Sequence, residues 1–361
     1  MPDIQRKILE STQSTHILSG PVAPQSDSPL FALLPAEVRS HIFTYALTDY
    51  PDPSPDRRYG DETIYTRPNY FAPRKHDAQL LQTCRAVYRE AWFMPFVLKE
   101  HTHWVGHGDR APPEYRDSNA PQRLEDRLRH ITEHQGGQAV EIHSLRVFAQ
   151  MWALESGGLF NLLTIPNLHP RNVTLTIRHA DWWYWEQDEP LRFQGRWIRR
   201  VNEKMSNSVR EVCIEIESVE RKKQQLDEMA DMMADRWCFK RPDGTVLYAD
   251  TTPGRRSVDR WSGSSTWQGC TWTRDETSPG TIGFYLLAIT FRPQAVIERQ
   301  GGKISDNAKK AAKNDLYDDN SMNLRVAGPE PASPWSGGES EDDDDDEDSD
   351  EDSDEDSDED V

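Results

Sequence analysis

The chain has 361 residues and a formal net charge of −20, and only 35% of its residues are hydrophobic. This apolar fraction is low for a globular protein, so we expect part of the chain to remain unfolded. Residues 339–360 hold 18 Asp and Glu among 22 residues, and removing these charges leaves −2 for everything else. A nearly neutral body lacks the strong positive charge typical of nucleic-acid binding, so we expect no nucleic-acid partner.

The cysteine spacing and the apolar runs indicate a location inside the cell. No two cysteines have the spacing of a zinc finger or a redox motif, because Cys84, Cys213, Cys238 and Cys270 are at least 25 residues apart. The N-terminus has no apolar signal region, and the longest apolar run, at 283–291, is too short to span a bilayer. We therefore expect reduced thiols, no membrane contact, and a location in the cytoplasm, the nucleus or both.

Residues 1–29 mix Ser, Thr, Gln and Pro with little periodicity, which predicts a disordered arm. The stretch 35–47 then predicts a helix, because Pro35 suits its first turn and apolar residues follow at spacings of three and four. These residues form two adjacent stripes, one with Val38, Ile42 and Ala46 and the other with Phe43 and Leu47. Two stripes are more than a short helix needs for its own core, so we expect one to cover something else.

Five prolines between residues 50 and 73 predict a long loop. Asp77 is then expected to cap a second helix, AQLLQTCRAVYREAW, which Pro95 ends. We predict that residues 30–100 form a helical module, in which the two helices pack as a pair around a proline-rich insertion.

Residues 101–299 alternate between helix and strand patterns and predict a body with an α+β fold, a mixed sheet carrying helices on which the helix pair packs. Helices are expected at 121–134, 158–163, 195–205 and 220–237, and strands at 142–148, 173–177, 209–216, 245–248, 265–273 and 282–291. Residues 300–361 are expected to form an acidic tail without a fold.

Two sequence patterns carry a family resemblance. Leu34-Pro35-x-Glu37-Val38, followed by Ile42-Phe43-x-Tyr45-Ala46-Leu47, resembles the opening of an F-box, and Leu-Leu-x-Thr-Cys-Arg at 80–85 resembles its later helix, with Tyr88 where F-boxes commonly carry Trp. Together with 178–185, these patterns are similar to a group of filamentous-fungal F-box-like proteins of uncharacterised function.

The resemblance implies a non-enzymatic interaction protein. An F-box docks to the Skp1 adaptor of a cullin ubiquitin ligase, and the body would then select an unknown target protein. The partner-binding residues that the resemblance implies are Leu34, Pro35, Glu37, Val38, Ile42, Phe43 and Leu47. The alternative is that the two helices only cap the sheet of the body.

We expect no cofactor, no metal and no catalytic set. His130-x-x-Glu133-His134 fits the H-x-x-E-H order of a zinc protease, but no third ligand is evident, so an exposed helix end is favoured. His101 and His103 are expected to be surface histidines, because no carboxylate or Cys lies at ligand spacing. The sequence has no nucleophile elbow, phosphate-binding loop or dinucleotide fingerprint.

Three remaining features have structural and functional interpretations. Trp182, Trp183 and Trp185 could stack a ligand, but strand-like alternation favours packing. The basic residues 221–223 are expected on a solvated helix face. The acidic run 339–360, in which Ser-Asp-Glu-Asp repeats, either keeps the protein soluble or binds histones or other basic nuclear proteins, which is our second functional hypothesis.

Overall fold

The computed structural model describes residues 18–52, 54, 59–60, 63, 74–314 and 322–326. The chain divides into two units, Met1–Ala327 and Gly328–Val361, and all described residues belong to the first. The acidic run 339–360, most of the predicted arm and most of the proline-rich insertion therefore lie outside the described residues. Separate domains at 30–100 and 101–299 stay a prediction.

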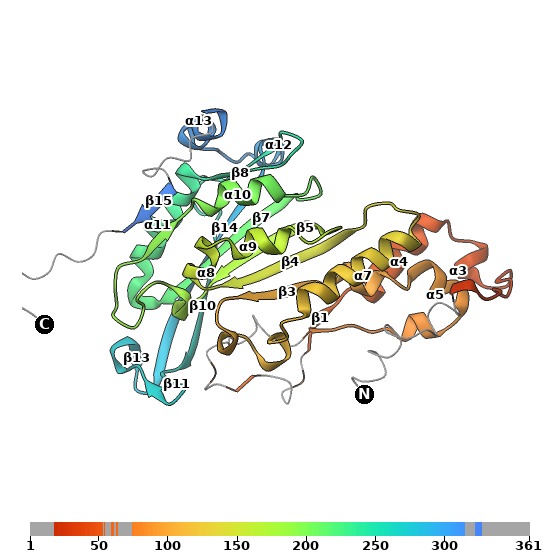
Figure 1. Ribbon diagram of the computed structural model, residues 1–361, viewed down its shortest axis with the longest axis horizontal. Helices are drawn as coiled ribbons and strands as arrows, with labels where there is room; N and C mark the ends of the chain where they lie inside the picture. Colours follow the sequence, from red (N-terminus) through yellow and green to blue (C-terminus); the bar gives the residue numbers. More distant parts are fainter. Residues whose placement is uncertain are drawn as a thin grey trace, which may run out of the picture. The chain divides into compact units, whose positions relative to one another are not determined.

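A nine-stranded mixed sheet is the centre of the fold (Figure 1). Its four parallel strands, in spatial order, are β3 (Glu100–Val105), β4 (Glu141–Ala149), β5 (His169–Ile177) and β7 (Glu211–Val219). The antiparallel strand β14 (Thr281–Pro293) follows and also pairs with β9 (Val246–Ala249), β10 (Ser257–Ser264) and β13 (Glu276–Ser278), while β8 (Cys238–Lys240) pairs with β9. The predicted mixed sheet with helices is confirmed, and the fold class is α+β.

The two faces of the sheet differ because side chains alternate along each strand. On one face, Leu175 and Ile214 are fully buried in the main core. The helices α8 (Met151–Glu155), α9 (Gly158–Leu163), α10 (Trp197–Lys204) and α11 (Lys223–Arg236) contribute to that core. Leu124 and Leu128 of α7 (Ala120–His134) belong to it as well. The other face carries polar side chains as well as aromatic ones such as Phe148, and Glu215 there accepts hydrogen bonds from Arg146 (2.8 Å) and Thr176 (2.7 Å).

A second core joins the N-terminal helices to the edge of the sheet. The elements here are α3 (Pro29–Ala32), α4 (Ala36–Leu47), the 3₁₀ helix η2 (Gln79–Gln82), α5 (Arg85–Ala91), α6 (Met94–Leu98) and α7 (Ala120–His134). Phe43 of α4, Tyr88 of α5, Val97 of α6 and Ile131 of α7 all belong to this buried cluster. Leu18, from the predicted arm, packs against it as well.

The predicted helix 78–92 is wrong as a continuous element. Cys84 has φ −158° and ψ 161°, so extended backbone separates η2 from α5. Pro95 does not end a helix but lies in the first turn of α6, where its missing amide costs no hydrogen bond. The chain therefore forms two short helical pieces, η2 and α5, where one helix was expected, and α6 begins after that range.

The prediction that nothing folds after residue 300 is also wrong. After α12 (Gln294–Arg299), the chain forms α13 (Asp306–Asn314) and β15 (Asn323–Arg325), which pairs with β6 (Arg192–Gln194). Ala308 and Ala312, one helical turn apart, are buried in a small cluster with Tyr248 and Ile297. Two small side chains give only a weak periodic signal in the sequence.

The other predicted body elements are present within a few residues of their predicted ends, except at 265–273. There the chain forms a small hairpin, β11 (Thr266–Trp267) and β12 (Cys270–Thr271), because Gln268 and Gly269 turn it with φ of 52° and 77°. The remaining elements are β1 (Tyr50–Pro51), β2 (Arg74–Lys75), η3 (Gly108–Arg110), η4 (Pro113–Tyr115), η5 (His179–Asp181), η6 (Glu220–Lys222) and η7 (Thr273–Asp275). In the described part of the chain, no helix has the length and apolar character to cross a bilayer.

Candidate functional site

Helix α4 leaves one of its two apolar stripes open. Val38 is 43% exposed and Ile42 is 40% exposed, and Tyr45 beside them is 85% exposed. Leu33, at the end of α3, is 77% exposed. Exposed large apolar side chains that gather on one helix face are the kind of surface that marks an interaction site.

The residues predicted to bind a partner fall into two groups. Pro35, Glu37, Val38 and Ile42 are exposed, and Leu34 is partly exposed. Phe43 and Leu47 are fully buried in the second core, so they hold α4 in place and offer a partner no surface. The partner-binding role predicted for these two residues is therefore corrected. The role of the other five stays a prediction.

Arg39 holds α4 in position and was missed by the sequence analysis. Its Nε lies 3.1 Å from both carboxylate oxygens of Glu90 in α5, and its Nη1 donates to the Leu34 carbonyl at 2.7 Å. The guanidinium also lies over the Phe31 ring. One side chain therefore joins α4, α5 and the segment before α4. The sequence gives no signal for this pair, because Arg39 and Glu90 are 51 positions apart.

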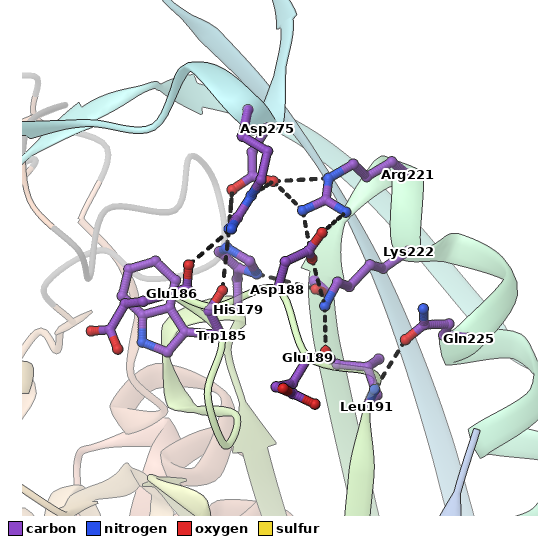
Figure 2. A network of polar contacts seen from close by, with 12 residues as sticks. His179, Trp185, Glu186, Asp188, Glu189, Leu191, Arg221, Lys222, Gln225 and Asp275 are labelled. Carbon is purple, nitrogen blue, oxygen red and sulfur yellow. Dashed lines mark hydrogen bonds and ion pairs between the residues drawn. The ribbon is translucent and has the colours of Figure 1, made fainter. Parts of the chain in front are cut away.

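A cluster of charged side chains lies at the carboxyl ends of the parallel strands, where α/β proteins often bind ligands. Figure 2 shows Asp188 from the loop after β5, Arg221 and Lys222 from η6, and Asp275 from η7 meeting there. Arg221 bonds Asp188 at 2.7 Å and Asp275 at 2.5 Å, and Lys222 lies 2.8 Å from Asp188. Lys222 is buried, so the solvated face predicted for residues 221–223 is wrong at this position.

His179 is the one histidine of this cluster, and its chemistry is that of a structural residue. Its Nδ1 lies 3.1 Å from Ser218 Oγ, and its Nε2 lies 4.0 Å from Asp275. Burial lowers the pKa of His179 to about 4, although Asp275 opposes the shift, so the ring is neutral near pH 7. The adjoining cavity is only about 40 Å³, which is room for a few water molecules. We therefore interpret the cluster of His179, Asp188, Arg221, Lys222 and Asp275 as structural: its ion pairs hold the loops together, and we call it the brace.

The histidine motifs do not form a metal centre in the described residues. His130 and His134 lie near the end of α7 with their rings 4.2 Å apart, and both rings contact Trp92. His101 is buried rather than exposed as predicted, because α6 covers it and its Nε2 lies 2.8 Å from the Phe96 carbonyl. Among the residues described, no three His, Cys, Asp or Glu side chains are placed to hold a metal ion.

The tryptophans of 182–185 pack as predicted, but not on a strand. Trp182 and Trp185 are buried, and Trp182 Nε1 donates to the Glu217 carbonyl at 2.8 Å. The chain turns at Tyr184, which has φ 52°, so strand alternation is not the reason for this packing. Trp183 is partly buried, and its Nε1 donates a hydrogen bond to Glu155. The neighbouring Tyr184 ring is more exposed than the three tryptophans.

Comparison with known proteins gives no match: no family model, curated protein or solved structure corresponds to this chain. The F-box resemblance therefore stays a prediction carried by its two sequence patterns.

Proposed function

We propose that this chain is a non-enzymatic interaction protein that docks a protein partner through the exposed face of α4. The partner that the sequence resemblance suggests is the Skp1 adaptor of a cullin ubiquitin ligase, with the sheet body selecting a target protein. The observation that carries the proposal is the open stripe of Val38 and Ile42, with Tyr45 beside it, on a helix whose other stripe is buried.

The exposed area is large enough to matter energetically. Fully burying a Val or Ile side chain contributes about 1.5–3 kcal/mol, and Val38 and Ile42 keep roughly two fifths of their surface for a partner. Tyr45 adds an aromatic ring, which is enriched among the residues that dominate interface energies. The Arg39–Glu90 ion pair fixes the helix before binding, so less ordering entropy opposes docking.

A binding experiment with two charge variants on α4 tests the proposal. Ile42→Asp places a carboxylate in the docking face and should weaken binding of purified Skp1 at least tenfold. Ser40→Asp introduces the same charge on an exposed position of the same helix, about 200° around its axis, and should leave binding unchanged. Equal binding by wild type and both variants, or no binding by any, would contradict adaptor docking.

A second candidate function rests on the tail alone. The 18 acidic residues of 339–360 form a polyanion that would attract histones or other basic proteins. Salt-sensitive histone binding that disappears when residues 339–361 are deleted would support this function, since added salt screens such contacts. Histone binding that survives the deletion would exclude it.

A further inference from the structure

A cavity of about 320 Å³ opens between α4, α6 and the amino-terminal ends of β4 and β5. This volume lies within the range of small-molecule sites. Its apolar lining consists of Phe43, Phe93, Met94, Val97, Leu98 and Val140. Phe43, Met94 and Val97 are already buried, whereas Phe93, Leu98 and Val140 keep exposed surface that a ligand can cover.

The mouth of the cavity is polar and carries both signs of charge. The residues around it are Ser40 and Thr44 of α4, Glu90 of α5, Glu141 and His143 of β4, and Arg171 of β5. Arg171 Nε lies 2.6 Å from Glu141 Oε2, and Arg210 Nη2 lies 3.7 Å from that same oxygen. Two guanidinium groups therefore share one carboxylate.

The other acid at the mouth is already neutralised. Arg39 lies 3.1 Å from both oxygens of Glu90, so this pair contributes no net charge. The group formed by Glu141, Arg171 and Arg210 keeps one surplus positive charge. The side chains of Arg171 and Arg210 are 43% and 65% exposed, so both are accessible to a ligand from solvent.

We propose that this cavity binds an amphipathic carboxylate, an acid with an aliphatic chain. The chain lies against the partly exposed side chains of Phe93, Leu98 and Val140. The carboxylate bonds the guanidinium groups of Arg171 and Arg210, whose planar geometry suits it. Because Ser40 and Thr44 of α4 form one wall, the ligand also fixes α4 against the sheet. The site is separate from the docking stripe of Val38 and Ile42 and does not depend on adaptor binding.

Calorimetric titration of the full chain with decanoate, below its micellar concentration, tests the site. We expect saturable binding that strengthens about fourfold per CH₂ from hexanoate to decanoate, since each buried methylene adds transfer free energy. 1-Decanol, which has the tail without the charge, should bind at least tenfold more weakly. The double variant Arg171→Gln with Arg210→Gln should also bind decanoate at least tenfold more weakly than wild type. Arg129→Gln, which removes an exposed guanidinium elsewhere, is the matched control and should bind decanoate as wild type does.

Ser40→Trp tests the cavity itself by filling its mouth from an exposed position, so the core stays intact. This variant should abolish decanoate binding, and urea unfolding will confirm that it is folded. Absence of saturable binding, equal affinity for the acid and the alcohol, or equal loss in Arg129→Gln would overturn the proposal. Ile42→Asp should bind decanoate normally, so failure of this site and failure of adaptor docking are distinguishable.

Discussion

The α4 face and the carboxyl edge of the sheet depart in opposite directions from the usual arrangement of apolar side chains inside and charged ones outside. On α4, Val38 and Ile42 remain substantially exposed. At the sheet edge, Arg178, Asp181 and Asp275 are buried. Both departures cost free energy, and among the described residues only the buried charges of the sheet edge have a compensating group.

At the sheet edge the compensation is internal. Arg178 bonds Asp181 at 2.7 Å, and Asp275 is held by Arg221 and Arg274. Burial opposes ionisation of Asp188, but bonds from Arg221 and Lys222 outweigh it and lower its pKa to about 2. Within the part of the chain that the structure describes, the exposed side chains of α4 have no such cover. This contrast is the reason why we propose an external partner for α4 and none for the sheet edge.

The largest effect that we expect is from breaking a buried ion pair at the sheet edge. Asp181→Asn removes the carboxylate charge that lies 2.7 Å from the buried Arg178 guanidinium and should lower the free energy of unfolding by about 3–5 kcal/mol. Urea denaturation of wild type and variant measures this difference in the free energy of unfolding. The control, Asp126→Asn, breaks an exposed pair with Arg129 and should cost less than about 0.5 kcal/mol. Similar losses in the two variants would mean that the sheet-edge pair is solvated.

Truncating the buried stripe of α4 comes next. Leu47→Ala removes a side chain with no exposed surface and should lower the free energy of unfolding by about 2–5 kcal/mol. The same urea titration is suitable. A loss below about 1 kcal/mol would contradict the packing of α4 on the second core, and with it the distinction between its two stripes.

A pH titration sharpens the assignment of His179 to the brace. The unfolded residue titrates near 6.5 and the folded one at about 4, so its contribution to stability is fully present above pH 6.5 and is lost as the pH falls towards 4. The shift corresponds to a loss of the order of 3 kcal/mol. In His179→Gln the free energy of unfolding should therefore fall less steeply over this range than in wild type. Parallel curves would show that His179 is not buried neutral.

The parts of the fold and of the candidate site that could be predicted from the sequence are those whose pattern lies within one short segment. The eight-residue alternation at 209–216 identified a central strand, and the spacing on α4 identified two stripes. Which stripe faces inward was not predictable, because Val38 with Ile42 and Phe43 with Leu47 are equally apolar and only tertiary packing distinguishes them. Arg221 and Asp275, 54 positions apart, each look like an ordinary surface charge in sequence. The break at Cys84 likewise interrupts a regular helical pattern.

The smallest effect on stability is expected from Tyr45, and it bears most directly on function. Tyr45→Ser replaces a side chain that is 85% exposed by one of similar helix propensity, so the free energy of unfolding should change by less than about 0.5 kcal/mol. Binding of the partner should weaken several-fold, since an interfacial ring is lost while the fold is kept. If the variant instead lost as much stability as Leu47→Ala, Tyr45 would already be covered in solution. The α4 face would then be as self-contained as the sheet edge.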